Sequence, residues 1–288
     1  MHIHHTRSTL SVVIATTLFT LCGACSHIAE NERLIDIGPA QNPDTTQIQD
    51  SIIRPVARRV LIEDHTGQHC PNCPDAADII HDMQQAYPNR IVPVAIHSEQ
   101  QGIMEPEGLA NELGNTYYRH WNVQFKPAGL VSRMDGGDGQ RVLDKTIWIY
   151  AVQYALEQPT PLDISIQATY TKDHPRQGEI EVDVICTSEE AAVDGRLQVW
   201  LTEDSIVAPQ FDMSTVRNDY VHNHVLRAAV NGTWGELVSV KGHADRRHYR
   251  YTATIPPQCN PEHMNVVAFV YTDEEVMQAA QKEIIHTK

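Results

Sequence analysis

Residues Arg59–Arg90, RVLIEDHTGQHCPNCPDAADIIHDMQQAYPNR, decide the fold of the first half of the chain. The stretch opens with an apolar run at Val60–Ile62, which is short enough for a buried strand. A turn and the motif Cys70-Pro-Asn-Cys73 follow. Apolar residues then recur at steps of three and four, the spacing of one face of an amphipathic helix: Ala76, Ile79, Ile80, Met83 and Tyr87. Because Ile91–Ile96 is a second apolar run, the stretch predicts a strand–helix–strand unit with both cysteines at the start of its helix.

The position of the two cysteines indicates redox chemistry. Cys70 would stand before the helix, where unpaired amides and the positive helix end stabilise a thiolate, the attacking species in disulfide exchange. Cys73, one turn further on, could resolve a mixed disulfide. This placement predicts that Cys70 is the more accessible and more reactive sulfur. Two other interpretations stay open, an inert structural disulfide and a metal pair, although no second cysteine pair completes a set of four metal ligands.

The composition bounds the possible functions. With 288 residues the chain can bury a substantial core, and two domains are expected. There are 22 Lys and Arg against 37 Asp and Glu, which gives a net charge of −15 and no electrostatic support for binding nucleic acid. The sequence contains no motif for a cofactor or a metal ion.

The N-terminus is typical of an exported protein. Residues 1–24 combine a positive start with an uncharged apolar stretch at Leu10–Leu21, which predicts a signal peptide. The small residues before Cys25 resemble a bacterial lipobox, which implies that Cys25 is acylated and becomes the mature N-terminus. The sequence departs from that pattern at Cys22, where a Leu is usual, and ordinary cleavage without a lipid is the alternative. Residues 25–57 are polar and are interpreted as a tether.

The rest of the chain divides into a helical part and a β part. Apolar spacing predicts helices over Gly108–Trp121 and Leu143–Leu156, and Gln158–Pro161 marks a boundary. The first domain is therefore expected to span residues 58–158. In residues 159–288 short alternating runs predict the strands of an all-β antiparallel sandwich: Leu162, Ile164 and Ile166; Ile180, Val182 and Val184; Leu197, Val199 and Leu201; Tyr249, Tyr251 and Ala253; Val266–Tyr271; Glu275–Ile285.

Four residues of the second domain are further candidates for a site. Cys186 is expected in a strand and Cys259 in a loop, and in an oxidising compartment the two could form a structural disulfide. His222 and His224 would share one strand face and could bind a metal ion. Two ligands are too few to define a metal site, so an exposed polar face is the preferred interpretation.

The first domain resembles the thioredoxin-like proteins. In that α/β fold a proline, usually cis, begins the strand that packs against the C-x-x-C motif, and the backbone before it pairs with substrate. Pro127 occupies the corresponding place, so the resemblance implies that it shapes a substrate groove. Two residues depart from the family pattern: His69 stands in place of a Trp and Asn72 in place of a Pro. These departures predict modest activity.

Several longer strings resemble one family. They are Asp-His-Thr-Gly-Gln-His-Cys-Pro-Asn-Cys-Pro at 64–74, Tyr-Val-His-Asn-His-Val-Leu-Arg at 220–227 and Asn-Val-Val-Ala-Phe-Val-Tyr at 265–271. The family is the one related to the twenty-eight-kilodalton outer membrane protein of Gram-negative anaerobes. The resemblance implies a lipid-anchored protein of the outer membrane, facing the periplasm or the cell surface, with a thioredoxin-like domain followed by a β-sandwich. Adhesin or receptor roles have been proposed for that family.

Two functions follow from these observations. The first is thiol–disulfide exchange with protein thiols or disulfides, with Cys70 as nucleophile, Cys73 as resolving cysteine and Pro127 shaping the groove. The second is non-enzymatic surface binding or adhesion that keeps the thioredoxin fold as a scaffold. In both, the expected link to the membrane is the lipid at Cys25.

Overall fold

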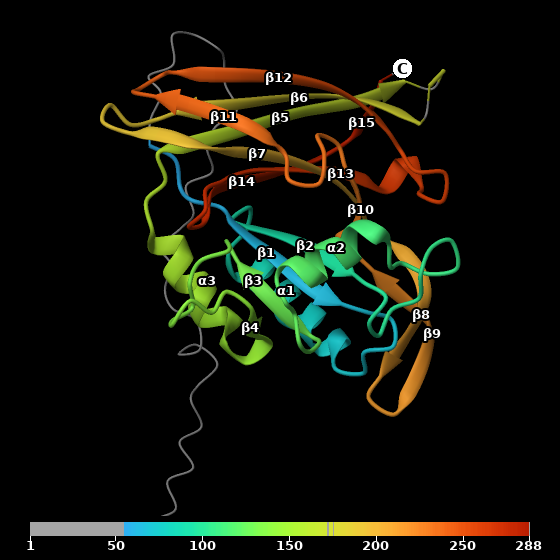
Figure 1. Cartoon of the computed structure of the whole chain (residues 1–288). Coiled ribbons are helices and arrows are strands. Elements are labelled where there is room, and N and C mark those ends of the chain that lie inside the picture. The colour runs from blue at the N-terminus through green and yellow to red at the C-terminus, as the bar shows by residue number, and fades with distance from the viewer. Residues whose placement is uncertain (1–54, 172, 175, 288) are drawn as a thin grey trace, which may run out of the picture. The chain divides into compact units, whose positions relative to one another are not determined.

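The structure is a computed structural model, and it describes residues 55–171, 173–174 and 176–287 (Figure 1). The predicted signal peptide, Cys25 and all but the last residues of the predicted tether lie outside this part of the chain. Among the residues described, none of the helices combines the length and the apolar character needed to cross a membrane.

The first part of the chain alternates strands and helices, as the sequence predicts. Its strands are β1 (Val60–Thr66), β2 (Ile91–His97), β3 (Ala128–Val131) and β4 (Leu143–Asp144). Its helices are α1 (Cys73–Ala86), α2 (Glu112–His120), the 3-10 turn η2 (Lys145–Ile147) and α3 (Trp148–Glu157). β1 pairs with β2 in parallel and with β3 antiparallel, and β4 extends the sheet beyond β3. The strand–helix–strand unit around the cysteines is thus confirmed.

Helices cover both faces of these strands. Residues of α1 and α3 share one apolar cluster with Val60 and Ile62 of β1, among them Ile80, Met83 and Trp148. The alternate residue Leu61 points to the other face and packs in a cluster with Tyr117 of α2. This alternation follows from the period of two along a strand.

The second part of the chain is built from strands, with the single turn η3 (Pro261–His263) as its only helical element within the described residues. The strands are β5 (Leu162–Thr171), β6 (Gln177–Cys186), β7 (Ala192–Glu203), β8 (Ile206–Asp212), β9 (Thr215–His222), β10 (Val225–Ala229), β11 (Glu236–Lys241), β12 (Arg246–Thr254), β13 (Met264–Tyr271), β14 (Val276–Glu283) and β15 (Ile285–Thr287). A large apolar cluster fills the space between β5, β6 and β12 on one side and β7, β11 and β13 on the other. The fold is therefore rich in β-structure.

One mixed sheet joins the two parts. Its order is β14-β13-β7-β10-β2-β1-β3-β4, with β11 also paired to β7. The link is short: Val225 of β10 pairs with Ala95 of β2, whose amide donates to the carbonyl of His224 (2.8 Å). The boundary predicted after residue 158 falls between α3 and β5, yet strands from both sides of it share this sheet.

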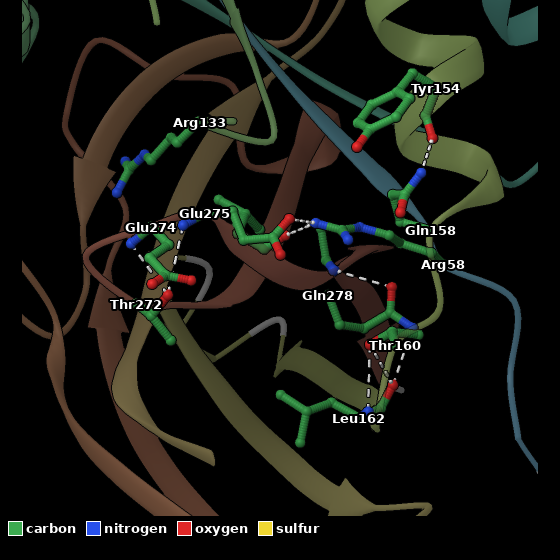
Figure 2. A network of polar contacts seen from close by, with 12 residues as sticks. Arg58, Arg133, Tyr154, Gln158, Thr160, Leu162, Thr272, Glu274, Glu275 and Gln278 are labelled. Atoms are coloured by element: carbon green, nitrogen blue, oxygen red, sulfur yellow. Dashed lines mark hydrogen bonds and ion pairs between the residues drawn. The ribbon is translucent and has the colours of Figure 1, made fainter. Parts of the chain in front are cut away.

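Polar contacts reinforce the junction. Figure 2 shows the guanidinium of Arg58, just before β1, directed at the carboxylate of Glu275 beside β14. The neighbouring Gln278 donates to the carbonyl of Leu162 in β5 (3.0 Å). Its side-chain oxygen accepts the amide of Arg59 (2.8 Å). The strand that leads to the cysteine motif is therefore fixed at its start by the β-rich part.

The structure differs from the sequence prediction in three places. α2 is shorter than the predicted helix over Gly108–Trp121, because the Asn111 side chain caps it by accepting the amide of Gly114 (2.8 Å). α3 begins at Trp148 because the residues after Leu143 first pair with β3 and then form η2. The predicted sandwich is not wholly antiparallel, because β15 pairs with β5 in parallel.

Candidate functional site

Cys70 and Cys73 form a disulfide at the start of α1. Their Cα atoms are 5.4 Å apart, and the amide of Cys73 donates to the carbonyl of Cys70 (3.3 Å). Cys70 ends the turn after β1, Cys73 is the first residue of the helix, and Pro74 stands in its first turn, where a missing amide hydrogen costs nothing. The two sulfurs are thus bonded where the sequence places a redox pair.

Both cysteines are buried. Cys70 has 0% of its surface exposed and Cys73 has 3%, so the prediction that Cys70 is the more accessible sulfur is wrong. The reason is the hairpin formed by β8 and β9, which comes from the second half of the chain and lies against the motif. The amide of Phe211 donates to the carbonyl of Gln68 (2.8 Å), and that of Met213 donates to the carbonyl of Pro71 (3.0 Å).

Pro127 lies at the same end of the sheet as the cysteines. The Lys126–Pro127 peptide bond is cis, and β3 starts at the next residue, Ala128, which pairs with His65 near the end of β1. β1 then leads through a short turn to the disulfide. The sheet thus brings Pro127 to the end of β1 from which the motif continues, as the thioredoxin resemblance implies.

A buried acid that the sequence analysis did not single out lies beneath the motif. Asp64 of β1 is 3% exposed, and its Oδ1 atom has no hydrogen-bond partner within the described residues. Burial raises the pKa of Asp64 from 3.8 to about 7, although the ammonium of Lys126 acts in the opposite direction. The carboxyl group is therefore poised to take up or release a proton near neutral pH.

The charge of Lys126 lowers the pKa of Asp64, but the Lys126 ammonium donates its hydrogen bonds to other residues. Its ammonium donates to the hydroxyl of Ser98 (2.7 Å) and to the carbonyl of Gln100, and it lies 5.3 Å from the centre of the Tyr118 ring. Burial lowers the pKa of Lys126 to about 7, while the charge of Asp64 raises it. Lys126, the residue before the cis proline, therefore gains or loses its proton near neutral pH.

A cavity of about 320 Å³ lies between α1, β2 and β9. Asp64, Cys73, His97 and His222 are among the residues that line it. The Nδ1 atom of His97 and the Nε2 atom of His222 are buried without a hydrogen-bond partner in the described part of the chain. Burial lowers the pKa of His222 to about 4 and that of His97 well below 6.5, so both rings are neutral at pH 7. Cys73 thus shares a polar cavity with the buried acid Asp64 and with two buried, neutral imidazoles.

The predicted pairing of His222 and His224 on one strand face is wrong. His222 is the last residue of β9, whereas His224 lies in the turn that follows, with a φ of 59°. The amide of His224 donates to the carboxylate of Asp204 (2.6 Å), and His222 and His224 both line the cavity beside α1 although they do not share a strand. Across the ranges described, three or more His, Cys, Asp or Glu residues do not come together in a way that could hold a metal ion.

Cys186 and Cys259 do not form the predicted disulfide. Both are free thiols in the buried core of the β-rich part. The thiol of Cys186 donates to the carbonyl of Ser188 (3.4 Å), and burial raises the pKa of Cys259 to about 12. A thiol with so high a pKa is almost entirely protonated at neutral pH and is a poor nucleophile.

Two residues near the disulfide, Asp64 and Gln210, were not predicted from the sequence, each for a different reason. Asp64 could have been found, because the run Glu63-Asp64-His65 places three polar residues inside a strand that is buried throughout. Gln210, which donates to the carbonyl of Cys70 (2.9 Å), left no such signal, because 140 positions separate the two residues.

Comparison with known proteins identifies the group to which the chain belongs. The fold and the site define a β-rich protein with a disulfide at a strand–helix junction. The family described as outer membrane protein Omp28 matches residues 114–288, which is more than half of the chain. The chain therefore belongs to the Omp28 family, and its location is the outer membrane. The match begins within α2, so the cysteine motif precedes it.

One solved structure supports the fold. HBP35 of Porphyromonas gingivalis is 12% identical, with a TM-score of 0.63 over 80% of this chain and 76% of that protein. A domain of the outer membrane lipoprotein Omp28 from the same organism is 26% identical over 45% of this chain and 92% of that domain, with a TM-score of 0.34. No curated protein matches the chain. At 12% identity the likeness to HBP35 concerns the fold alone.

Proposed function

We propose that the chain is a lipid-anchored outer-membrane protein that exchanges disulfides with other proteins through Cys70 and Cys73. The observation that carries this proposal is a disulfide at the start of a helix which shares a cavity with a buried carboxyl group of pKa about 7. The order β1-α1-β2-α2-β3-β4-α3 and the cis bond before Pro127 support a thioredoxin-like domain over residues 58–158. Residues 159–288 would form the β-sandwich domain.

The first step starts from the oxidised protein. A substrate thiolate attacks Sγ of Cys70, so a bond forms between the two sulfurs while the Cys70–Cys73 bond breaks. The electron pair of the broken bond leaves on the sulfur of Cys73. Protonated Asp64, which lines the same cavity as Cys73, gives its proton to that thiolate. Its raised pKa suits this role, because the acid still holds a proton up to about pH 7.

The second step completes the exchange. A second thiolate of the substrate attacks the substrate sulfur of the mixed disulfide, and Cys70 leaves as a thiolate. The substrate has then gained a disulfide and lost two electrons, which the Cys70–Cys73 dithiol holds. The reverse sequence reduces a substrate disulfide, so either direction needs only a dithiol or a disulfide protein as partner.

The reduction potential of the Cys70–Cys73 pair tests the proposal. Native protein is equilibrated with glutathione or dithiothreitol buffers at pH 7, and the oxidised fraction is measured by mass after alkylation. Catalytic pairs lie between about −120 and −270 mV, whereas structural disulfides lie below about −300 mV. We expect a value in the catalytic range. A value below the catalytic range would assign the pair to a structural bridge.

Trapping of mixed disulfides tests the order of attack. Cys73→Ala should accumulate mixed disulfides through Cys70, because the resolving thiol is missing, whereas Cys70→Ala should accumulate few. Cys186→Ala, which removes a buried free thiol far from the motif in sequence, is the matched control and should behave like the wild type. Equal trapping by both motif variants would contradict the assignment of Cys70 as nucleophile.

Surface binding without catalysis is the second candidate function. It is favoured by apolar side chains that stand exposed on the β8–β9 hairpin, with Val207 66% and Met213 71% exposed. Exposed apolar patches mark interaction sites. If the Cys70–Cys73 pair proves structural and no mixed disulfide forms, charged substitutions at these two positions should weaken attachment of the protein to its target surface.

The lipid anchor at Cys25 is part of the proposal and has its own test. A fatty-acid analogue fed to the producing cells should label the wild type and Cys22→Ala but not Cys25→Ala. Labelled protein should fractionate with membranes. Equal labelling of Cys25→Ala and wild type would rule out this anchor.

A further inference from the structure

The end of the β8–β9 hairpin contacts the cysteine motif through its main chain. The two main-chain amides that bond the motif belong to Phe211, near the end of β8, and to Met213, in the turn before β9, and they meet carbonyls on either side of Cys70. Because Met213 has a φ of 51°, the motif receives the last residues of a strand and the start of the turn that follows it. The two strands of the hairpin form a sheet of their own, separate from the larger sheets (Figure 1).

Side chains complete the contact. Gln210 donates to the carbonyls of Cys70 (2.9 Å) and Gly67 (3.3 Å), and Gln68 of the motif loop donates back to the carbonyl of Pro209 (3.0 Å). The ring of Phe211 meets the ring of His69 edge-on, with centres 5.1 Å apart. The hairpin thus uses backbone, amide and aromatic contacts on the residues that flank the nucleophile.

This contact blocks the chemistry of the motif. Cys70 has no exposed surface, and a thiolate must reach a sulfur in line with the bond that breaks. A second segment also holds the loop, because the amide of His69 donates to the carbonyl of Gln101 (2.7 Å). A protein substrate can reach Cys70 only after one of these two segments moves.

Of the two segments, we expect the β8–β9 hairpin to move and not residues 98–101. Most of β9 is exposed, and large apolar side chains of the hairpin face solvent, with Val207 66%, Val216 47% and Val221 48% exposed. An element that buries little apolar surface belongs to the low-stability part of a fold and opens locally without global unfolding. The 98–101 segment is held more firmly, because the half-buried ammonium of Lys126 donates to both Ser98 and Gln100.

We propose that the β8–β9 hairpin is a displaceable cover that occupies the groove of the polypeptide substrate. The inference rests on the proposed exchange reaction and names its substrate class. The substrate is a polypeptide segment that offers amides two positions apart to the carbonyls of Gln68 and Pro71, as Phe211 and Met213 do. It carries an aromatic side chain beside its cysteine, which replaces Phe211 against His69. Exchange is slow while the hairpin is docked and fast once it is displaced.

Removing the amide contact of Gln210 tests the cover. The rate at which a water-soluble phosphine reduces the Cys70–Cys73 disulfide is measured in the native protein for wild type, Gln210→Ala and the control Gln167→Ala, an exposed glutamine on β5. Loss of two hydrogen bonds at about 1 kcal/mol or less each should raise the rate roughly tenfold in Gln210→Ala alone. An unchanged rate in a variant that melts like the wild type would overturn the proposal.

Hydrogen exchange of the wild type gives an independent check that does not depend on a variant folding. The amides of Phe211 and Met213 should exchange far faster than those of the buried strand β13, because the hairpin opens on its own. Reduction of the disulfide should not be required for this opening. Exchange as slow as that of β13 would show that the hairpin is a fixed part of the fold, and the proposal would fail.

Two cysteine peptides test the substrate class. They differ only in Phe or Ala beside the cysteine, and single-turnover exchange with oxidised Gln210→Ala is followed by mass. The Phe peptide should react several-fold faster, and equal rates would overturn the proposed aromatic preference. If the disulfide exchanges with neither peptide while Gln210→Ala still speeds its reduction by phosphine, the exchange function fails and the cover stands. If wild type exchanges with peptides and Gln210→Ala matches it throughout, only the cover fails.

Discussion

Glu63 and Asp64 are neighbouring acids on β1, both are buried, and the sheet gives them opposite surroundings. The carboxylate of Glu63 accepts two hydrogen bonds from the guanidinium of Arg133, each 2.8 Å long. The guanidinium is enclosed by aromatic rings whose centres lie 4.7 to 5.9 Å away: Trp121, Trp200, Phe269 and Tyr271. Asp64, on the other face, has one oxygen without a hydrogen-bond partner among the described residues and shares a cavity with Cys73.

The difference in surroundings gives the two acids different roles. Glu63 is suited to a structural role and Asp64 to a chemical one. A buried charge is tolerated when it is paired and its hydrogen bonds are complete, and Glu63 meets both conditions. Its partner Arg133 lies in the junction between the two parts of the chain, so the pair joins them. Within the part of the chain that the structure describes, Asp64 has no bonded cation, because Lys126 donates to Ser98 and Gln100 instead. An unpaired buried carboxyl avoids its charge by holding a proton, which makes it useful beside a disulfide.

Breaking the Glu63–Arg133 pair should have the largest effect. Glu63→Gln leaves the Arg133 guanidinium buried without its counter-charge, which should lower the free energy of unfolding by roughly 3–5 kcal/mol. Urea denaturation measures the change. The control is Glu181→Gln, which removes an exposed ion pair with Arg250 and should cost roughly 1 kcal/mol or less. Similar losses in the two variants would show that enclosure by the aromatic rings contributes nothing.

Acid should destabilise the protein strongly, because three buried histidines have a lowered pKa and only one of the buried acids in the described residues, Asp64, has a raised pKa. Burial lowers the pKa of His65 to about 3, that of His222 to about 4 and that of His97 well below 6.5. Each contributes stability above pH 6.5 that is lost as pH falls. Asp64 acts in the opposite sense: its raised pKa gives stability that is present below pH 3.8 and lost as pH rises toward 7.

The net effect is an unfolded state that binds about two more protons than the native state between roughly pH 6 and 4.5. The free energy of unfolding should therefore fall by roughly 2.7 kcal/mol per pH unit across this window. Urea denaturation at several pH values measures the slope. Asp64→Asn removes the opposing contribution and should steepen the slope to roughly 4 kcal/mol per pH unit. A slope that Asp64→Asn leaves unchanged would contradict the unpaired state of this carboxyl.

The comparison also shows which features the sequence predicts. The strand, turn and helix around Cys70 and Cys73 depend on short-range periodicity, so they were predicted correctly, and Pro127 was placed through a resemblance. Glu63 is paired and Asp64 is not, and this difference depends on Arg133 and Lys126, which lie far along the chain from both acids. Their pairing is set by the three-dimensional packing of the sheet.

The hairpin over Cys70 was missed for the same reason. β8 and β9 carry scattered exposed apolar residues with no clean alternation, and their contact with the motif is a matter of tertiary structure. The Cys186–Cys259 bridge was predicted from the compartment alone, and both residues are instead free thiols in the buried core.

Asp64→Asn should slow disulfide exchange while leaving the disulfide in place. A general acid typically contributes about 10²–10⁴-fold, and here the lower end is expected because water can enter the cavity, which is partly open to solvent. The wild-type rate of the first step should change with a midpoint near pH 7, and this inflection should vanish in Asp64→Asn. Stopped-flow exchange with a cysteine peptide measures both. Asp78→Asn, an exposed acid on the rim of the same cavity, should keep the wild-type profile.

Replacing His222, whose Nε2 atom is buried without a hydrogen-bond partner among the described residues, should have the smallest effect of these variants. His222→Gln keeps a polar side chain in the cavity but removes a group that must take up a proton on unfolding. At pH 7.5, where His222 is neutral in both states, stability should change by less than about 1 kcal/mol. Between roughly pH 6 and 4.5 the slope should become shallower by about 1.4 kcal/mol per pH unit, since one proton fewer is bound on unfolding. His174→Gln, at an exposed turn, should leave the slope unchanged. If His222→Gln also leaves it unchanged, His222 is already protonated in the native cavity across this pH window, and the lowered pKa of its imidazole is wrong.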